Sequence, residues 1–258
     1  MQSHQVKSAL RALEILEYFK LNQQRRSMSE IAHDLGYPQS SATVLLKTLI
    51  TLGYLSYDRQ ERAYFPTPKV TSLGDWIPLA LFGTGKILEA MRDAHTATGE
   101  GIFIGTKSDI YLQYTRTIES IHALRFHVDE GSIVPLTRSA AGWMLLSSMP
   151  EDRLENLVRR ANIACPVQDR VSLKEMEERI AEIREKGYAR AQEVPLEGGA
   201  TIVVPLPVRI QGQPACLALG GVAQRINDNF ERYLDALKTA AASVASVEPF
   251  NTPIRIDN

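Results

Sequence analysis

A capping box, a glycine and a proline near the N-terminus leave room only for two short helices in close succession. Ser27 and Glu30 stand at the capping-box spacing that begins a helix, and Gly36 ends that helix. Pro38 suits the first helical position of the next helix, whose apolar spacing continues to about Gly53. Two short helices joined by such a turn predict a helix-turn-helix arrangement.

The flanking segments complete a small domain. Residues 6–21 repeat apolar side chains at helical spacing, namely Val6, Leu10, Leu13, Leu16 and Phe19. Residues 54–57 and 63–65 are alternating, aromatic-rich runs separated by a charged loop, which indicates a β-hairpin. We therefore expect residues 1–68 to form a winged helix-turn-helix domain.

The helix over residues 38–52 has a face suited to DNA. Its inward side is expected to hold Leu45, Leu49 and Leu52, flanked by Ser41, Ala42 and Thr48. Its outward side then holds Ser40, Thr43, Lys47 and Thr51, with Gln39 and Val44 at the edges. An ordinary surface helix mixes Glu and Lys, whereas a helix in a DNA groove keeps carboxylates away from phosphates and presents short donors and acceptors to base edges. This face therefore favours DNA recognition.

The rest of the chain predicts a second domain of mixed type. Residues 69–98 are helical with interruptions, and residues 99–250 alternate strand-like and helical runs. The expected strands are 101–106, 110–117, 201–208 and 215–222, and the expected helices are 139–149, 152–161, 173–186 and 229–247. A turn at residues 210–213 predicts antiparallel pairing of the last two strands. The fold class is therefore α+β, with a short tail at residues 251–258.

Composition sets outer limits on the function. The net charge of the 258 residues is −1, yet residues 1–68 carry two more basic than acidic side chains. No stretch is apolar enough to span a membrane, and the N-terminus lacks the apolar core of an export signal, so we expect no membrane association and a cytoplasmic location. Cys165 and Cys216 do not make a disulfide framework and suit a reducing compartment.

Several short segments are similar to enzyme motifs, but each motif is incomplete. Gly83-Thr84-Gly85-Lys86 is similar to a phosphate loop, but the first glycine of that pattern falls on Ala80 and Ile87 follows the lysine. His122 and His127 have no third metal ligand nearby, and His127 is expected to pack in or beside a strand. Neither cysteine has a visible base, and Trp143 is expected in a core or interface. We therefore expect no catalytic activity, no cofactor and no metal.

An ordered series of motifs gives the chain a family resemblance. In the first domain these are residues 8–21, 27–35, 36–41 and 49–55. Further along they are Leu73-Gly74, Thr98-Gly99-Glu100, Val134-Pro135-Leu136, Ser139-Ala140-Ala141-Gly142 and Gly187-Tyr188-Ala189. Together they resemble IclR-family transcriptional regulators over nearly the whole chain. The resemblance implies a DNA-binding domain (1–68), a linker and dimerisation helix (69–98) and a GAF-like effector-binding domain (99–250), in dimers or tetramers.

The expected DNA contacts combine base edges and phosphates. They are Arg25, Arg26, Gln39, Ser40, Ser41, Thr43, Val44, Lys47, Arg59 and Arg62. Family members often carry a His-Arg pair where this chain has Thr43-Val44, so the operator sequence does not carry over from relatives. Because one such domain makes few contacts, a dimer on palindromic or repeated half-sites is expected. The segment 69–98 either transmits ligand state between the domains or is a passive linker.

The resemblance also implies a ligand pocket with altered chemistry. In members that sense small polar acids, the pocket holds an Asp, a Cys and two Ser beside two backbone amides. The corresponding positions here are Ala191, Thr201, Ala218 and Gly220, and the amides are those of Ala140 and Ala141 after Ser139, with Arg138 as a second charge partner. These changes favour an aromatic or similarly apolar carboxylate, or its thioester, as the effector. The alternative is a collapsed core that binds no ligand.

Two other classes of function stay open at this point. A stand-alone ligand-binding or enzymatic GAF-like module with a winged helix for protein contacts would lack DNA affinity. A constitutive architectural DNA binder would bind with little sequence preference and would ignore ligands. The resemblance implies a regulator of a catabolic operon. The sequence leaves open whether it represses or activates, and whether it forms a dimer or a tetramer.

Overall fold

The computed structural model describes residues 6–82, 85–194 and 196–244, in two compact units, 1–78 and 79–258. The expected C-terminal tail and part of the Gly83-Thr84-Gly85-Lys86 segment lie outside the described residues. Among the described helices, none combines the length and the apolar character needed to cross a membrane.

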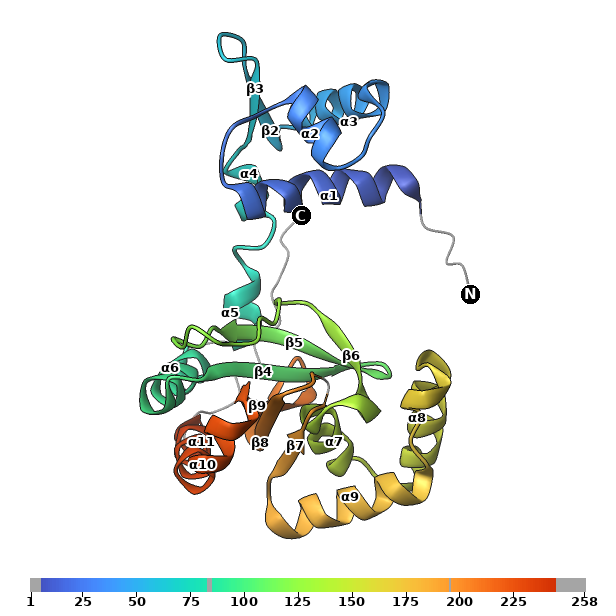
Figure 1. The fold of residues 1–258 in the computed structure, drawn as a ribbon, viewed down its shortest axis with the longest axis vertical. Helices are drawn as coiled ribbons and strands as arrows, with labels where there is room; N and C mark the ends of the chain where they lie inside the picture. Colours follow the sequence, from blue (N-terminus) through green and yellow to red (C-terminus); the bar gives the residue numbers. More distant parts are fainter. Residues whose placement is uncertain (1–5, 83–84, 195, 245–258) are drawn as a thin grey trace, which may run out of the picture. The chain divides into compact units, whose positions relative to one another are not determined.

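The first unit contains three helices in succession and then a hairpin. Its elements are α1 (Lys7–Asn22), β1 (Arg26–Ser27), α2 (Met28–Asp34), α3 (Gln39–Thr51), β2 (Leu55–Asp58), β3 (Ala63–Pro66) and α4 (Lys69–Ser72) (Figure 1). The capping box forms as expected, since the Ser27 hydroxyl accepts from the Glu30 amide and the Glu30 carboxylate accepts from the Ser27 amide. The predicted hairpin is present as the antiparallel pair β2–β3. The two-residue strand β1, which pairs with β3, was not predicted because it is too short to show a pattern.

The buried face of α1 includes only part of the apolar repeat seen in the sequence. Val6, Leu10 and Leu13 belong to the apolar repeat that predicted the helix, but they are 67%, 41% and 61% exposed. The core side of the helix instead holds Ile15, Tyr18 and Phe19, which pack against α2, α3 and the start of β2. Only the C-terminal half of α1 lies over the small core, so the earlier apolar residues have nothing in this unit to cover them.

The segment 69–98 is divided into α4, α5 (Ile77–Phe82) and α6 (Lys86–Thr98). The division between the two units falls after Pro78, inside the segment that we expected to be a separate linker. One face of α6 is buried in the second unit, where Ala90, Met91 and Ala94 join its core. Residues 86–98 are therefore structurally part of the effector-type domain.

The second unit is a six-stranded sheet with helices on both faces. Its strands are β4 (Gly101–Ser108), β5 (Tyr111–Ile118), β6 (Ile133–Pro135), β7 (Ala189–Gln192), β8 (Gly199–Ile210) and β9 (Gln213–Val222), in the spatial order β6-β5-β4-β9-β8-β7. Its further helices are α7 (Ala140–Ser147), α8 (Glu151–Ala164), α9 (Leu173–Lys186), α10 (Ala223–Asp228) and α11 (Phe230–Val244). Neighbouring strands run antiparallel, and β8 and β9 form the hairpin predicted from the turn between them.

Alternation along the strands explains the three layers. Ile102 and Ile104 on β4 belong to the core shared with α6 and α11, whereas Phe103 faces the opposite side with α7 and α9 (Figure 1). On β9, Leu217 and Leu219 likewise face the first core and Ala218 the second. Because both faces are covered, the strands read as nearly continuous apolar runs.

Candidate functional site

The inner face of α3 is centred one residue further along than expected. Ala42, Leu46 and Leu49 are the buried residues of this helix. Leu45 is half-buried and packs against the core of the first unit as expected, whereas Leu52 is 51% exposed, so the expectation that Leu52 faces the core was wrong. Leu52 lies at the C-cap, beyond the last helical turn that reaches the core.

The outer face of α3 carries most of the residues expected there. Gln39, Ser40, Lys47 and Thr51 are exposed, with Thr48 and Val44 beside them. Val44 is 65% exposed, so it belongs to the open face rather than to its edge. Ser41 and Thr43 are half-buried. The sequence of α3 contains no acidic residue, so a polyanion can approach this face without repulsion from the helix itself.

Three threonine hydroxyls on α3 donate to the helix backbone. Those of Thr43, Thr48 and Thr51 each bond to the carbonyl oxygen four residues earlier, at 2.8–2.9 Å. Because these hydroxyl protons are already donated to the helix, the three side chains can offer a ligand only acceptor lone pairs and methyl groups.

Arg25 and Arg26 are engaged within the protein. Arg25 bridges Asp58 at 2.8 Å and Glu61 at 3.0 Å, which attaches it to the β2–β3 loop. Arg26 pairs with Glu30 at 3.3 Å and is half-buried. Both arginines can therefore position α2 and the β2–β3 hairpin, which is the wing of this domain. A DNA phosphate would have to compete with Asp58, Glu61 and Glu30 for these side chains.

Arg59 and Arg62 lie on the exposed β2–β3 loop. No ion pair to either side chain, or to Lys47, occurs within the described ranges. Arg62 has a backbone φ of 51°, in the left-handed region that a tight hairpin turn requires. The three unpaired cations lie on the two elements, α3 and the wing, that a winged helix presents to DNA.

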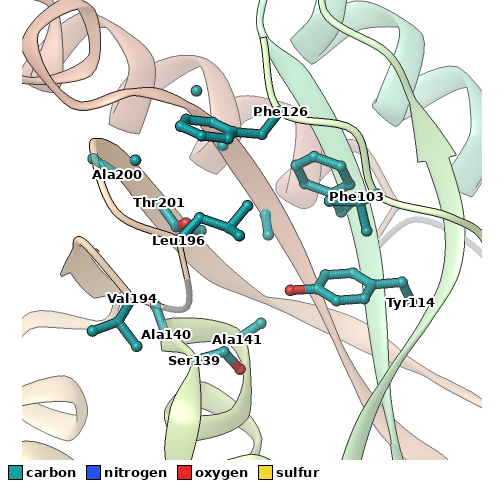
Figure 2. A pocket seen from close by; sticks show the side chains of 15 residues that line it. Phe103, Tyr114, Phe126, Ser139, Ala140, Ala141, Val194, Leu196, Ala200 and Thr201 are labelled. Carbon is teal, nitrogen blue, oxygen red and sulfur yellow. The ribbon is translucent and has the colours of Figure 1, made fainter. Parts of the chain in front are cut away.

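The second unit contains a pocket on the α7 side of its sheet. Its walls come from β4, β5, β8 and β9, from the start of α7, and from the loops after β5 and β7 (Figure 2). It is lined by Phe103, Tyr114, Phe126, Val128, Ser139, Ala140, Ala141, Val194, Leu196, Gly199, Ala200, Thr201, Ala218, Gly220 and Gly221. The cavity volume is about 50 Å³, less than an aromatic ring fills. None of these lining residues is charged.

The structure brings six of the eight expected ligand residues together. Ser139, Ala140, Ala141, Thr201, Ala218 and Gly220 line the pocket. Arg138 does not, because its guanidinium pairs with Asp169 at 3.0 Å. Ala191 is also outside the lining: it pairs with Thr201 in the β7–β8 register and packs among the α7 and α9 side chains.

Aromatic residues that the sequence analysis missed form much of the pocket. Phe103 on β4 and Tyr114 on β5 contact each other edge to face, with ring centroids 5.9 Å apart. Alternation within each strand could not have placed both on one face, because the pairing of β4 with β5 shifts register between Ile104 and Gly105. Phe126, on the loop after β5, could not be assigned either, because that loop has no periodic pattern.

The start of α7 supplies polar groups to this apolar pocket. The Ser139 hydroxyl caps the helix by accepting from the Gly142 amide at 3.0 Å. The amides of Ala140 and Ala141 precede it, in the first turn, where no intrahelical acceptor exists. Aligned peptide dipoles make such a helix start favourable for an anion.

The remaining candidate groups do not form a catalytic or metal site. Cys216 is fully buried, and burial raises its pKa to about 12, so it stays a thiol at neutral pH. His127 was expected beside a strand but lies exposed on the loop after β5, between Glu119 and Asp129. In the described parts of the chain, no cluster of three His, Cys, Asp or Glu side chains could bind a metal ion. Trp143 is a core residue, as expected.

Both units match domains of the same protein family. Residues 8–59 match the IclR helix-turn-helix domain, and residues 84–246 match the C-terminal domain of bacterial transcriptional regulator IclR. The chain therefore belongs to the IclR family of bacterial transcriptional regulators. It joins a DNA-binding domain to an effector domain, and it is a regulator rather than an enzyme.

Individual relatives extend the match over nearly the whole chain. The HTH-type transcriptional regulator KdgR of Escherichia coli (strain K12) is 26% identical over 95% of this chain and 94% of its own length. The effector domain of an IclR regulator from Acinetobacter sp. ADP1 is 48% identical, covers 66% of this chain and 99% of that chain, and has a TM-score of 0.62. The IclR structure from Thermotoga maritima is 24% identical over 93% of this chain and 98% of that chain, with a TM-score of 0.75. The predicted family and fold class are thus confirmed.

Proposed function

We propose that this regulator binds operator DNA through α3 and the wing, and that its effector is an aromatic or similarly apolar carboxylate, or the thioester of one. The observation that carries the effector proposal is a pocket lined mostly by apolar side chains and by no charged one, at the start of α7. In this proposal the controlled genes form a catabolic operon, and the protein acts in the cytoplasm, where that operon lies.

The pocket chemistry favours an apolar acid over a small hydroxylated one. A polar group buried against Ala218 or Gly220 without a partner costs about 1–3 kcal/mol, because these two residues offer it no side-chain hydrogen bond. An aromatic ring avoids that cost and gains about 25 cal/mol for each Å² of apolar surface removed from water. The carboxylate then bonds to the amides of Ala140 and Ala141.

Ligand entry requires movement at the pocket mouth. The cavity of about 50 Å³ must enlarge to hold a ring. Phe126 and Leu196 are the side chains best able to move, because they lie on loops and Leu196 is 43% exposed. Their displacement by the effector would couple binding to the position of these loops.

Operator recognition is proposed to require a dimer. Bases would be contacted by Gln39, Ser40, Ser41, Thr43, Val44 and Lys47, and phosphates by Arg59 and Arg62, with Arg25 and Arg26 holding the wing and α2 in register. Leu73 and Trp76, both 55% exposed, provide apolar surface near α4 for a second copy. A dimer would read two half-sites, palindromic or repeated.

Calorimetry on the full-length chain tests the effector proposal. Benzoate and phenylacetate are compared with glyoxylate and pyruvate, and Ala218→Phe serves as the blocked-pocket variant. We expect the aromatic acids to bind more tightly and Ala218→Phe to abolish their binding. Tighter binding of the two small acids, or aromatic binding that Ala218→Phe leaves unchanged, would contradict the proposal.

Fluorescence anisotropy with operator DNA separates this function from its rivals. We expect sequence-specific binding that the effector changes. Binding with little sequence preference and no response to ligand would instead identify an architectural DNA binder. Absence of DNA affinity at low salt would identify a stand-alone ligand-binding module.

A further inference from the structure

Tyr114 places a phenol hydroxyl inside the effector pocket. The residue lies on β5 and is only 9% exposed. Figure 2 shows its ring crossing the pocket wall, with the hydroxyl oxygen pointing into the space between Thr201 and Ala141. No hydrogen bond joins this hydroxyl to a described residue, and its oxygen is not among the fully buried unpartnered atoms, so water in the pocket can reach it. The ring itself is held in place by the edge-to-face contact with Phe103.

The hydroxyl of this tyrosine is available to a molecule that enters the pocket. Phenylalanine would fill the same space, but it would offer a ligand no hydrogen-bond donor. An acceptor on the ligand can therefore replace water at this hydroxyl.

The hydroxyl shares the pocket with two further donors that lack partners in the helix. These are the amides of Ala140 and Ala141, in the first turn of the eight-residue helix α7. The next amide, that of Gly142, is already bonded to Ser139. The pocket thus combines two backbone donors with one side-chain donor, and each is suited to an acceptor that carries negative charge.

We propose that Tyr114 determines effector specificity by donating a hydrogen bond to the carboxylate held at the Ala140 and Ala141 amides, so that the pocket selects monocarboxylates over dianions. This inference rests on the proposed effector site and identifies a residue and a charge class that the proposed function leaves open.

The charge class follows from the lining. Three neutral donors and a helix dipole can stabilise one negative charge, but no Lys or Arg lines the pocket to compensate a second. Arg138, the nearest basic residue in sequence to α7, is paired with Asp169. A phosphate ester or a dicarboxylate would therefore bury an uncompensated charge.

The hydroxyl is also in the right protonation state. Burial raises the pKa of Tyr114 to about 12, so the phenol keeps its proton at neutral pH and can donate it. A carboxylate is an acceptor only, so donor and acceptor are matched.

The test uses the full-length protein and the isosteric variant Tyr114→Phe. Tyr111→Phe, which removes a phenol hydroxyl from the same strand outside the pocket lining, is the matched control. Benzoate, neutral benzamide and dianionic phenyl phosphate are titrated by calorimetry at pH 7.5. Thermal unfolding without ligand is measured for each variant.

We expect benzoate to bind Tyr114→Phe about 10- to 100-fold more weakly than the wild type, as for loss of a hydrogen bond to a charged group. Benzamide affinity should change much less, and phenyl phosphate should bind the wild type at least tenfold more weakly than benzoate does. The ligand-free melting temperature of Tyr114→Phe should equal or exceed that of Tyr111→Phe, because no bond within the protein is lost.

Distinct outcomes contradict the two proposals. If the wild type binds benzoate and Tyr114→Phe binds it equally well or better, the role of Tyr114 is overturned while the proposed function stands. A melting temperature several degrees lower for Tyr114→Phe would show that the hydroxyl already has a partner in the protein, with the same consequence. Equal affinity for phenyl phosphate and benzoate would overturn the charge class. If the wild type binds no aromatic carboxylate, both the proposed effector class and this inference are contradicted.

Discussion

At the scale of single residues, α3 offers DNA mostly acceptors and methyl groups. The hydroxyls of Thr43 and Thr51 are bonded to the helix backbone, and Val44 presents an apolar surface. These groups suit the exocyclic amines of adenine and cytosine and the methyl group of thymine. Lys47 is the basic residue of this helix, so it is the side chain best able to recognise guanine.

Replacing Lys47 with Ala should weaken operator binding by about 1–3 kcal/mol and relax the choice at one base pair in each half-site, if the lysine contacts a guanine edge. Anisotropy titrations against operators with single-base changes measure both effects. Lys7→Ala, which removes an exposed lysine of α1, is the control. Unchanged affinity and unchanged base preference in Lys47→Ala would remove this residue from the interface.

Arg62 is expected to contact a phosphate rather than a base. Because its φ is 51°, Arg62→Gly removes the charge while suiting the backbone of the turn, so the wing should stay folded. Affinity should fall to a similar degree for operator and scrambled DNA, and the slope of log K against log[salt] should shrink by about 0.9. Titrations at several salt concentrations measure this slope, and an unchanged slope would contradict a phosphate contact.

At the scale of elements, Glu100 joins the end of α6 to the pocket loop. Its carboxylate is fully buried and accepts from Arg225 of α10, at 2.9 Å for Nη2, and from the Tyr233 hydroxyl of α11 at 3.4 Å. The preceding residue, Gly99, accepts from both Ser120 and Ile121 at the start of the loop that carries Phe126. The helix that leads into the effector domain and a wall of the pocket are thus held by one cluster.

Glu100→Gln should destabilise the effector unit by about 3 kcal/mol, because it leaves Arg225 without its counter-charge in a largely buried site. Glu130→Gln is the matched control, since Glu130 pairs with Arg116 at 3.2 Å on the surface and should cost less than about 1 kcal/mol. Urea unfolding followed by circular dichroism measures the difference. Equal midpoints for the two variants would show that the buried pair does not stabilise this joint.

Most helices and strands could be predicted because their ends carry local signals. The capping box at Ser27 and Glu30 and the turn before β9 are formed as expected. Strands β1 and β6 were missed because two or three residues are too few to show a period, and β7 because Ala189–Gln192 contains no aromatic or β-branched side chain. The helix α1 was predicted, but not which of its apolar residues are buried, because periodicity identifies an apolar face and not what covers it.

The pocket was predictable only in part. The start of α7 and the positions on β8 and β9 followed from the family resemblance, and the structure brings Ala140, Thr201 and Ala218 together. Its aromatic wall depends on the β4–β5 register, which shifts between Ile104 and Gly105, and on an irregular loop. Neither feature is encoded by a local pattern.

At the scale of the whole molecule, α1 carries an apolar stripe that a single chain leaves exposed. Val6, Leu10 and Leu13 recur at helical spacing on one side of α1, yet they are exposed in a single chain. A second copy of the same helix would bury such a stripe and bring two recognition helices into one assembly. In the proposed dimer, this stripe would add a contact to that proposed near Leu73 and Trp76.

The final prediction tests this stripe with Leu13→Glu. Leu13 is 61% exposed, so a glutamate should leave the fold of the monomer intact, but burying its charge against a second copy is unfavourable. Ser8→Glu adds the same charge to the opposite side of α1 and is the control. Sedimentation should show a lower mass for Leu13→Glu than for Ser8→Glu at micromolar concentration. Operator affinity should fall at least tenfold only in Leu13→Glu, because two linked half-site contacts become one. Equal masses would mean that α1 contributes nothing to assembly, and reduced mass with unchanged operator affinity would mean that one copy suffices to read the operator.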